Sequence, residues 1–200
     1  MLRQIAEWMT ANWPELTGSV LGLISVAFQY KQNPLLWPIS IVVAVIYTYV
    51  FVDSGLYAYS LLQLYYIIIG IYGWFIWIKK TEGNDKLKVS RTSQKTYIYL
   101  LTTFIFLYFV FFLTLHYFTD SDVKYIDSFI TSLSFVATWM LARKKLENWL
   151  VWFVADIVSV GLYFHKELYA TAVFYSVLTI VAIFGFFEWK KQMQKSAKLL

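Results

Sequence analysis

An acidic residue interrupts one of the apolar segments of the chain, a short distance after two tryptophans. Trp149, Trp152 and Asp156 are spaced i, i+3 and i+7, so on a helix they share one face, which Tyr163 continues. Aromatic rings beside a negative charge are groups that bind an organic cation. A carboxylate in the middle of a bilayer costs about 2.5–3.5 kcal/mol on insertion scales, so its default interpretation is a functional group. These residues therefore predict a binding site for an aromatic cation.

The composition of the chain is that of an integral membrane protein. Of its 200 residues 60% are hydrophobic, 21% are aromatic and 14% are charged, and the charges are gathered in short islands. Between the islands lie seven apolar runs long enough to span a bilayer as helices, at residues 13–30, 35–52, 55–78, 97–118, 125–142, 146–164 and 168–189. We therefore expect an all-α integral membrane protein with seven transmembrane helices.

The basic residues are distributed unequally between the two sides of this bundle. If the helices alternate in direction, 14 of the 17 Lys and Arg residues fall on one side and only Arg3, Lys124 and Lys166 on the other. The positive-inside rule then places the C-terminus in the cytoplasm and the N-terminus outside. This distribution explains the net charge of +5 without a nucleic-acid partner. Residues 1–12 lack the apolar core of a signal peptide and resemble a short amphipathic segment.

The chain contains an internal repeat. A shift of 112 residues aligns Trp37 with Trp149, Gly73 with Gly185 and Trp77 with Trp189. Matches among such rare residues seldom arise by chance, even in apolar sequence. The sequence thus predicts two parallel three-helix bundles, in residues 1–96 and 119–200, joined by a linker helix at 97–118. Parallel repeats of this kind occur in transporters that bind their substrate between the repeats.

Polar residues mark one face of the run 125–142. Asp127, Thr131, Ser134 and Thr138 form a stripe that either lines a water-filled path or holds helices together. Asp127 lies near the outer end of this run, where it could equally cap its own helix.

The run 55–78 carries Gln63 and Tyr66 on one broad face. The Gln63 amide is informative because an amide in hydrocarbon requires a partner. Trp77 and Trp189 lie near the cytoplasmic boundary of their runs, where we expect them to anchor the helices at the membrane interface.

Several other functional classes do not fit these residues. The chain has no cysteine, which excludes disulfides and thiolate metal sites, and His116 and His165 lie at the outer boundary rather than where they could hold a haem. The last apolar run has no central lysine to hold retinal. A single deep carboxylate cannot divide the roles of acid and base, so neither enzymatic activity nor a catalytic, metal or cofactor site is expected. A structural or assembly protein stays open as an alternative to a carrier.

Several stretches of the chain form a longer pattern: Leu61-Leu62-Gln63, Tyr72-Gly73-Trp74, Asp127-Ser128, Arg143-Lys144, and Glu147-Asn148-Trp149-Leu150-Val151-Trp152 continuing to Asp156. With them, nearly the whole chain after residue 15 resembles the PnuC family of bacterial vitamin transporters, which includes nicotinamide riboside, thiamine and riboflavin members. The resemblance implies a fold similar to that of the SWEET sugar transporters. It also implies facilitated diffusion across the bacterial inner membrane without ion coupling, and trapping of the vitamin by a cytoplasmic kinase.

The resemblance further implies which residues bind the substrate. The aromatic and amide positions of the family map onto Trp149, Trp152 and Asp156, with Gln63 and Tyr66 as partners across the cavity. Asp127, Ser134 and Tyr163 complete the candidate set from the faces described above.

Substrate choice depends on the residue at position 156, where many nicotinamide riboside members have Asn. Asp156 adds a charge that favours a cation, so thiamine is expected, nicotinamide riboside is the alternative, and neutral riboflavin gains nothing. The oligomeric state stays open, a homo-oligomer included.

Overall fold

A computed structural model of the chain describes residues 13–53, 57–79 and 87–198, and these residues form seven α-helices. Among them the only β contact is a single parallel bridge between Ser90 and Lys145. The helices coincide with the seven apolar runs to within a few residues at most ends, so the expected all-α class is confirmed. The amphipathic segment expected at residues 1–12 lies outside the described residues.

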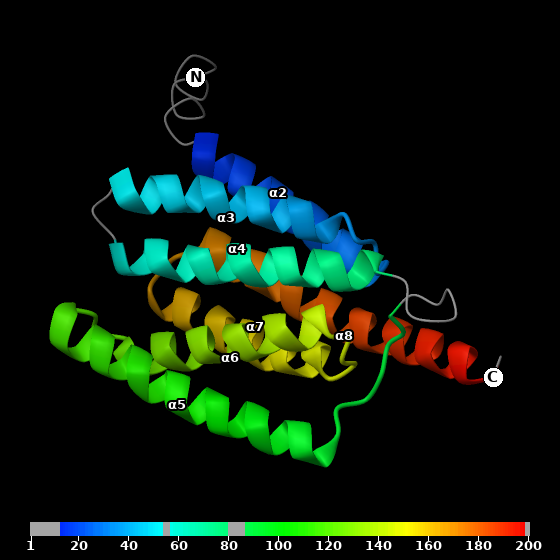
Figure 1. The fold of residues 1–200 in the computed structure, drawn as a ribbon. Coiled ribbons are helices and arrows are strands. Elements are labelled where there is room, and N and C mark those ends of the chain that lie inside the picture. The colour runs from blue at the N-terminus through cyan, green and yellow to red at the C-terminus, as the bar shows by residue number, and fades with distance from the viewer. Residues whose placement is uncertain (1–12, 54–56, 80–86, 199–200) are drawn as a thin grey trace. The chain divides into compact units, whose positions relative to one another are not determined.

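The first unit of the chain, Met1–Leu87, contains three of the helices: α2 (Trp13–Tyr30), α3 (Leu36–Asp53) and α4 (Tyr57–Ile78). Helix α3 packs against α2 on one side and α4 on the other (Figure 1). The hydroxyls of Ser25 and Ser40 join α2 to α3 by a hydrogen bond of 2.7 Å.

The second unit, Lys88–Leu200, contains four helices: α5 (Gln94–Phe118), α6 (Lys124–Ala142), α7 (Asn148–His165) and α8 (Tyr169–Ala197). They pack in chain order, α5 on α6, α6 on α7 and α7 on α8. Helix α5, at the position of the expected linker helix, has no buried residue. The exact domain limits expected from the sequence stay a prediction.

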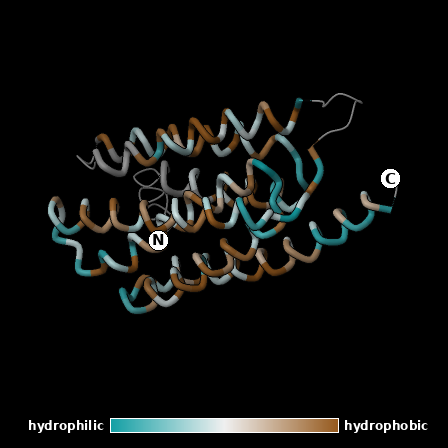
Figure 2. Tube along the Cα trace, turned by 60° about the horizontal axis from the view of Figure 1, so that its bottom comes forward, coloured by the Kyte–Doolittle hydropathy of each residue, from teal (hydrophilic) through white to brown (hydrophobic). Residues whose placement is uncertain are grey.

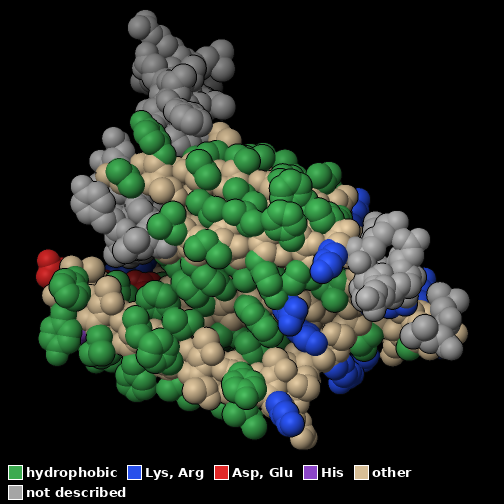
Figure 3. Space-filling model, viewed as in Figure 1, with side chains coloured by type: hydrophobic (Ala, Val, Ile, Leu, Met, Phe, Trp, Pro, Cys, Tyr) green, Lys and Arg blue, Asp and Glu red, His purple; other side chains and the backbone are tan. Residues whose placement is uncertain are grey.

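The helices carry the apolar surface that a bilayer requires. Within the described residues, four helices are long and apolar enough to cross a membrane: Gln94–Phe118, Lys124–Ala142, Asn148–His165 and Thr171–Ala197. Shorter apolar stretches lie in the other three, at Val20–Tyr30, Leu36–Val50 and Leu62–Ile78. Figure 2 shows hydrophobic residues along the helices and hydrophilic ones at the turns and the last turns of α8. In Figure 3 most of the Lys and Arg side chains in view lie toward the end at which α5 begins and α8 ends.

Each unit contains the same pair of edge-on tryptophans. The rings of Trp37 and Trp77 are 5.5 Å apart at 89°, and those of Trp149 and Trp189 are 5.6 Å apart at 90°. The repeat predicted from the sequence is therefore present in three dimensions. Trp77 and Trp189 are only 1% and 0% exposed, so the prediction that they anchor the helices at the membrane interface is wrong. A tryptophan that anchors a helix at the membrane interface must reach the lipid headgroups, whereas these two rings fill the space between two helices.

Candidate functional site

Helix α7 carries four of the eight candidate residues, and Trp149 is the most enclosed of them. Its side chain is 2% exposed, because the ring packs between Trp189 and the backbone of Gly185 on α8. The indole N–H of Trp149 is buried and has no acceptor among the described residues. This position is primarily a packing position, and direct contact of Trp149 with a ligand stays a prediction.

Asp156 lies two turns further along α7 and is buried. Its side chain is 5% exposed, and no donor or cation from the described parts of the chain contacts its carboxylate. Burial of a carboxylate without a partner is costly, and more so inside a membrane. The absence of an ion pair agrees with the sequence, which offers no Lys or Arg at this depth. Asp156 is therefore available to pair with a cation from outside the chain.

Trp152 precedes Asp156 by one helical turn and is half-buried. Its indole N–H is also buried without an acceptor in the described structure. An unused donor and an unused acceptor thus lie one turn apart on the same helix. Tyr163, further along α7, stacks on Tyr175 of α8 with ring centroids 5.2 Å apart and an interplanar angle of 20°.

The two repeats differ at these positions. The 112-residue shift that superposes Trp149 on Trp37 places Ser40 opposite Trp152 and Ala44 opposite Asp156. The Ser40 hydroxyl is satisfied by the carbonyl of Leu36 at 2.8 Å, and Ala44 is buried. The tryptophan pair, with the unsatisfied indole N–H of Trp37 and Trp149, is thus common to both repeats, whereas the Trp152 indole and the Asp156 carboxylate have no counterpart at the matching positions of the first repeat. A feature that packing does not require of both repeats points to a function.

The candidate residues on α6 form hydrogen bonds within α6 and with the loop that precedes it. Asp127 is half-buried in the first turn, and its carboxylate accepts a hydrogen bond of 3.5 Å from the Ser121 hydroxyl. A negative charge in that turn also complements the helix dipole. The Ser134 hydroxyl donates to the carbonyl of Ile130 at 2.9 Å, and Thr138 donates to the carbonyl of Ser134 at 2.7 Å. These two hydroxyls of the polar stripe are therefore satisfied within the helix.

Gln63 and Tyr66 lie on α4, in the first unit. Both are half-buried, and the Tyr66 ring meets that of Tyr65 at 5.5 Å and 62°. Because they belong to a different unit from α7, their expected place across a cavity from Trp152 and Asp156 stays a prediction.

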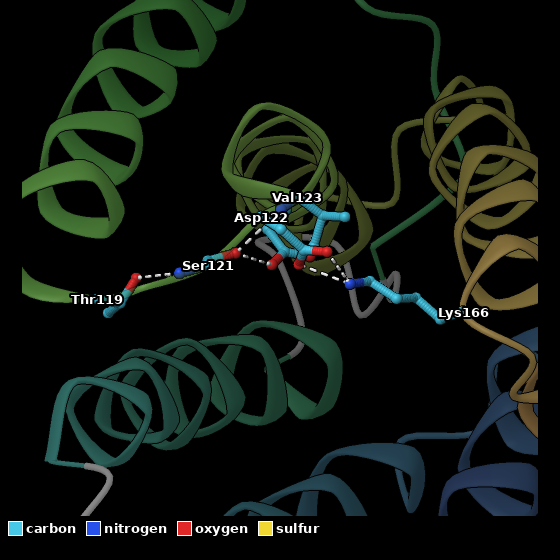
Figure 4. A network of polar contacts seen from close by, with 6 residues as sticks. Thr119, Ser121, Asp122, Val123 and Lys166 are labelled. Carbon is cyan, nitrogen blue, oxygen red and sulfur yellow. Dashed lines mark hydrogen bonds and ion pairs between the residues drawn. The ribbon is translucent and has the colours of Figure 1, made fainter.

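A polar network joins the loop between α5 and α6 to the turn between α7 and α8 (Figure 4). Lys166 forms an ion pair with Asp122, and the ammonium group holds the pKa of that carboxyl below its usual range. In the same loop, the Ser121 hydroxyl accepts a hydrogen bond of 3.3 Å from the backbone N–H of Val123. This network fixes one end of the second unit.

A second polar cluster, at the start of α7, is not apparent from the sequence. Glu147 is buried, and its carboxylate accepts hydrogen bonds from the backbone N–H of Thr92 at 2.9 Å and from the Thr92 hydroxyl at 2.8 Å. The local signal was an acidic residue two positions after the basic run Arg143-Lys144-Lys145. Nothing local relates that residue to Thr92, 55 positions earlier.

The fold and these positions define a class of protein. Apolar helices in two repeats, with an unpaired carboxylate inside one helix, are the arrangement of a polytopic membrane carrier. The described residues contain no cluster of potential metal ligands.

Comparison with known proteins identifies the family. Residues 12–191 match the family described as "Nicotinamide mononucleotide transporter", and the chain belongs to this family of membrane transporters. The predicted membership in the PnuC family and the non-enzymatic nature of the protein are thereby confirmed.

The chain is similar to the nicotinamide riboside transporter PnuC of Escherichia coli, with 25% identity over 89% of this chain and 85% of that protein. It is also similar to the riboflavin/roseoflavin transporter RibM of Streptomyces davaonensis, with 22% identity over 93% and 88% of the two chains. The crystal structure of the vitamin B3 transporter PnuC shares the fold, with a TM-score of 0.72, 18% identity and coverage of 96% of this chain and 87% of that one.

Proposed function

We propose that the protein carries a cationic, water-soluble vitamin across the membrane by facilitated diffusion. The observation that carries the proposal is the buried carboxylate of Asp156, which no described residue pairs, one turn from the unsatisfied indole N–H of Trp152. A planar cation that also carries an acceptor oxygen matches both residues, because its charge pairs with the carboxylate, its ring packs on the indole and its oxygen accepts from the indole N–H. Gln63, Tyr66, Asp127, Ser134, Tyr163 and Trp149 are the further residues proposed to line the path.

The charge at position 156 selects among the vitamins of the family. Thiamine carries a thiazolium and nicotinamide riboside a pyridinium, so both gain from Asp156, whereas riboflavin is neutral and leaves the carboxylate unpaired. We take thiamine as the first candidate, because Asp rather than Asn strengthens the demand for a cation. Nicotinamide riboside is the second candidate, because a transporter named for it is similar over 89% of this chain.

Net uptake by a uniporter requires removal of the transported molecule. A cytoplasmic kinase that phosphorylates the vitamin is the proposed partner, since a phosphorylated product carries added negative charge that the carboxylate at 156 repels. The proposed site of action is the bacterial cytoplasmic membrane, with the N-terminus outside and the basic C-terminus inside.

Calorimetric titration of the purified protein with thiamine, nicotinamide riboside and riboflavin tests the proposal. We expect saturable binding of a cationic vitamin and none of riboflavin. Uptake of the same labelled vitamins into proteoliposomes that contain the matching kinase and ATP then tests carriage. Preference for nicotinamide riboside over thiamine would reverse the order of the candidates. Failure of all three to bind would favour the structural or assembly role instead.

A further inference from the structure

A short extended strap, residues 89–93, crosses the turn between α6 and α7. The backbone N–H of Ser90 donates to the carbonyl of Lys144 at 3.1 Å, and the N–H of Leu146 donates back to the carbonyl of Ser90 at 3.0 Å. These two bonds form the single parallel bridge between Ser90 and Lys145. The strap is thus attached to the turn through its backbone.

Side chains strengthen the same attachment. The Glu147 carboxylate receives both the backbone N–H and the hydroxyl of Thr92, and Glu147 and Thr92 are only 9% and 8% exposed. Hydrogen bonds to an ionised, buried acceptor are stronger than neutral ones. The ammonium of Lys145 donates to the Ser90 hydroxyl at 3.0 Å. Glu147 is therefore the central acceptor of the attachment.

The turn beneath the strap has an unfavourable backbone conformation. Lys144 has a φ of 47°, in the left-handed region that residues with a Cβ disfavour. Its carbonyl is the acceptor for Ser90, so the strap binds the strained residue itself. The next carbonyl, that of Lys145, accepts a hydrogen bond from the backbone N–H of Asn148 at 3.1 Å and another from the Asn148 side-chain amide at 2.6 Å. Asn148 is the first residue of α7. The hydrogen bonds of the strap therefore fix the backbone that leads into the first turn of α7.

The strap also lies at the start of the second unit, directly before α5. The two units divide between Leu87 and Lys88, so the strap is the first part of the second unit that the chain from the first unit reaches. Ser93 at its end caps α5 by accepting from the N–H of Thr96 at 3.2 Å. Since α5 buries none of its own residues, polar attachments at its ends help to hold it on the second unit.

We propose that Glu147 is a positioning residue of the substrate site: by holding the strap it fixes the start of α7, and with it Trp152 and Asp156. The strap stays bound throughout the transport cycle rather than opening as a gate. This inference rests on the proposed function, because it concerns the residues assigned there to the vitamin.

The first test compares Glu147→Ala with Glu147→Gln. The Gln variant retains an amide oxygen that accepts from Thr92, whereas the Ala variant retains no acceptor. Loss of a buried hydrogen bond to a charged group corresponds to about a tenfold effect or more, so we expect Glu147→Ala to raise the Kd and KM for the vitamin by about tenfold. Glu147→Gln is expected to stay within about threefold of the natural protein, with the maximal uptake rate little changed.

The second test restores the attachment without Glu147. Bridged residues lie about 5 Å apart, within the ~4.4–6.8 Å range of Cα separations in disulfides, so Ser90→Cys with Lys145→Cys is suited to form one. The natural chain has no cysteine, so no other thiol interferes. We expect the oxidised pair to transport normally and to restore affinity to Glu147→Ala, and a reductant to abolish that rescue. The two single cysteine variants are the controls.

Hydrogen exchange of the amides at the start of α7 provides a readout that needs no ligand. It should rise in Glu147→Ala and fall again in the oxidised triple variant. Unchanged exchange and affinity in Glu147→Ala, or failure of the disulfide to restore them, would overturn the inference. The inference would also be overturned if the disulfide stopped uptake in the protein that keeps Glu147, because the strap would then have to open during transport. If the natural protein binds no vitamin, the proposed function fails, while the exchange experiment still decides whether Glu147 orders α7.

Discussion

The ring of Trp149 lies directly against the backbone of Gly185, so that a methyl group added to this glycine would come within 2.6 Å of the indole. The first repeat contains the same contact, where a methyl group at Gly73 would approach the ring of Trp37 to 2.4 Å. In each repeat the absence of a side chain allows a tryptophan to fill the space between two helices. The contact explains why both residue types recur at the same spacing.

Replacement of these glycines should therefore destabilise the protein. Gly185→Ala and Gly73→Ala are each expected to lower the free energy of unfolding by about 1–3 kcal/mol, because the added atom forces the indole out of its place. Gly161→Ala on α7 is the matched control, since nothing lies within 4 Å of its added atom. Because Ala favours a helix by about 1 kcal/mol over Gly, the control should be neutral or stabilising. Thermal unfolding in detergent measures all three, and equal effects at Gly161 and Gly185 would refute the packing argument.

Substitution of the two tryptophans at the start of α7 should have different effects, with a loss of stability at Trp149 and a loss of binding at Trp152. Trp149→Ala, like its repeat counterpart Trp37→Ala, is expected to cost about 3–5 kcal/mol of stability, because each ring is buried. Trp152→Ala is expected to unfold at a temperature closer to that of the natural protein and to lose affinity for the vitamin. Parallel unfolding and calorimetric titrations would show this, and normal binding by a folded Trp152→Ala protein would remove Trp152 from the site.

Asp156 should determine the preference for a cation. Asp156→Ala is expected to lose more than about tenfold in affinity for the cationic vitamin, while Asp156→Asn keeps the shape and part of the affinity. Asp122→Asn serves as the control, because it also removes a carboxylate but lies in the loop between α5 and α6. Calorimetry measures the series. Full affinity in Asp156→Ala would contradict the role given to this carboxylate.

The ion pair between Asp122 and Lys166 should make stability depend on pH. The lysine lowers the pKa of Asp122 in the folded protein, so the pair contributes above the unfolded pKa of about 3.9, and the contribution disappears as the pH falls through the folded pKa. Asp122→Asn should therefore lower the unfolding temperature slightly near neutral pH, and the two proteins should converge in acid. The effect should shrink in high salt because the pair is exposed. A difference that does not shrink as the pH falls below about 3.9 would indicate another cause.

The orientation of the chain can be tested because it contains no natural cysteine. Ser93 and Thr119 are both exposed, and they flank the two ends of α5, Ser93 before its first residue and Thr119 after its last. Thr119→Cys should react with a membrane-impermeant thiol reagent applied to whole cells, and Ser93→Cys should react only after the cells are permeabilised. The opposite pattern would reverse the orientation predicted from the basic residues.

The sequence predicted the helices well because their signal is local. Each apolar run between polar islands must satisfy its own backbone hydrogen bonds in a bilayer, which leaves a helix as its structure. The run expected at residues 13–30 ends where helix α2 ends, at Tyr30. The repeat was equally visible, because Trp and Gly are rare enough for their recurrence to be informative.

The tertiary structure decided what those recurring residues do. Position near the end of an apolar run suggested that Trp77 and Trp189 anchor the membrane interface, yet both rings lie between helices against Trp37 and Trp149. Spacing on α7 grouped Trp149 with Trp152 and Asp156, yet Trp149 packs against Trp189 and Gly185 of α8, whereas Trp152 is only half-buried. The contact of Glu147 with Thr92 joins residues 55 positions apart, and no local pattern specifies it. Sequence alone determined that this chain forms apolar helices in two similar sets, because lipid acts on each segment separately. Which side chains pack and which stay unsatisfied depends on the neighbouring helices, and only the folded chain supplies them.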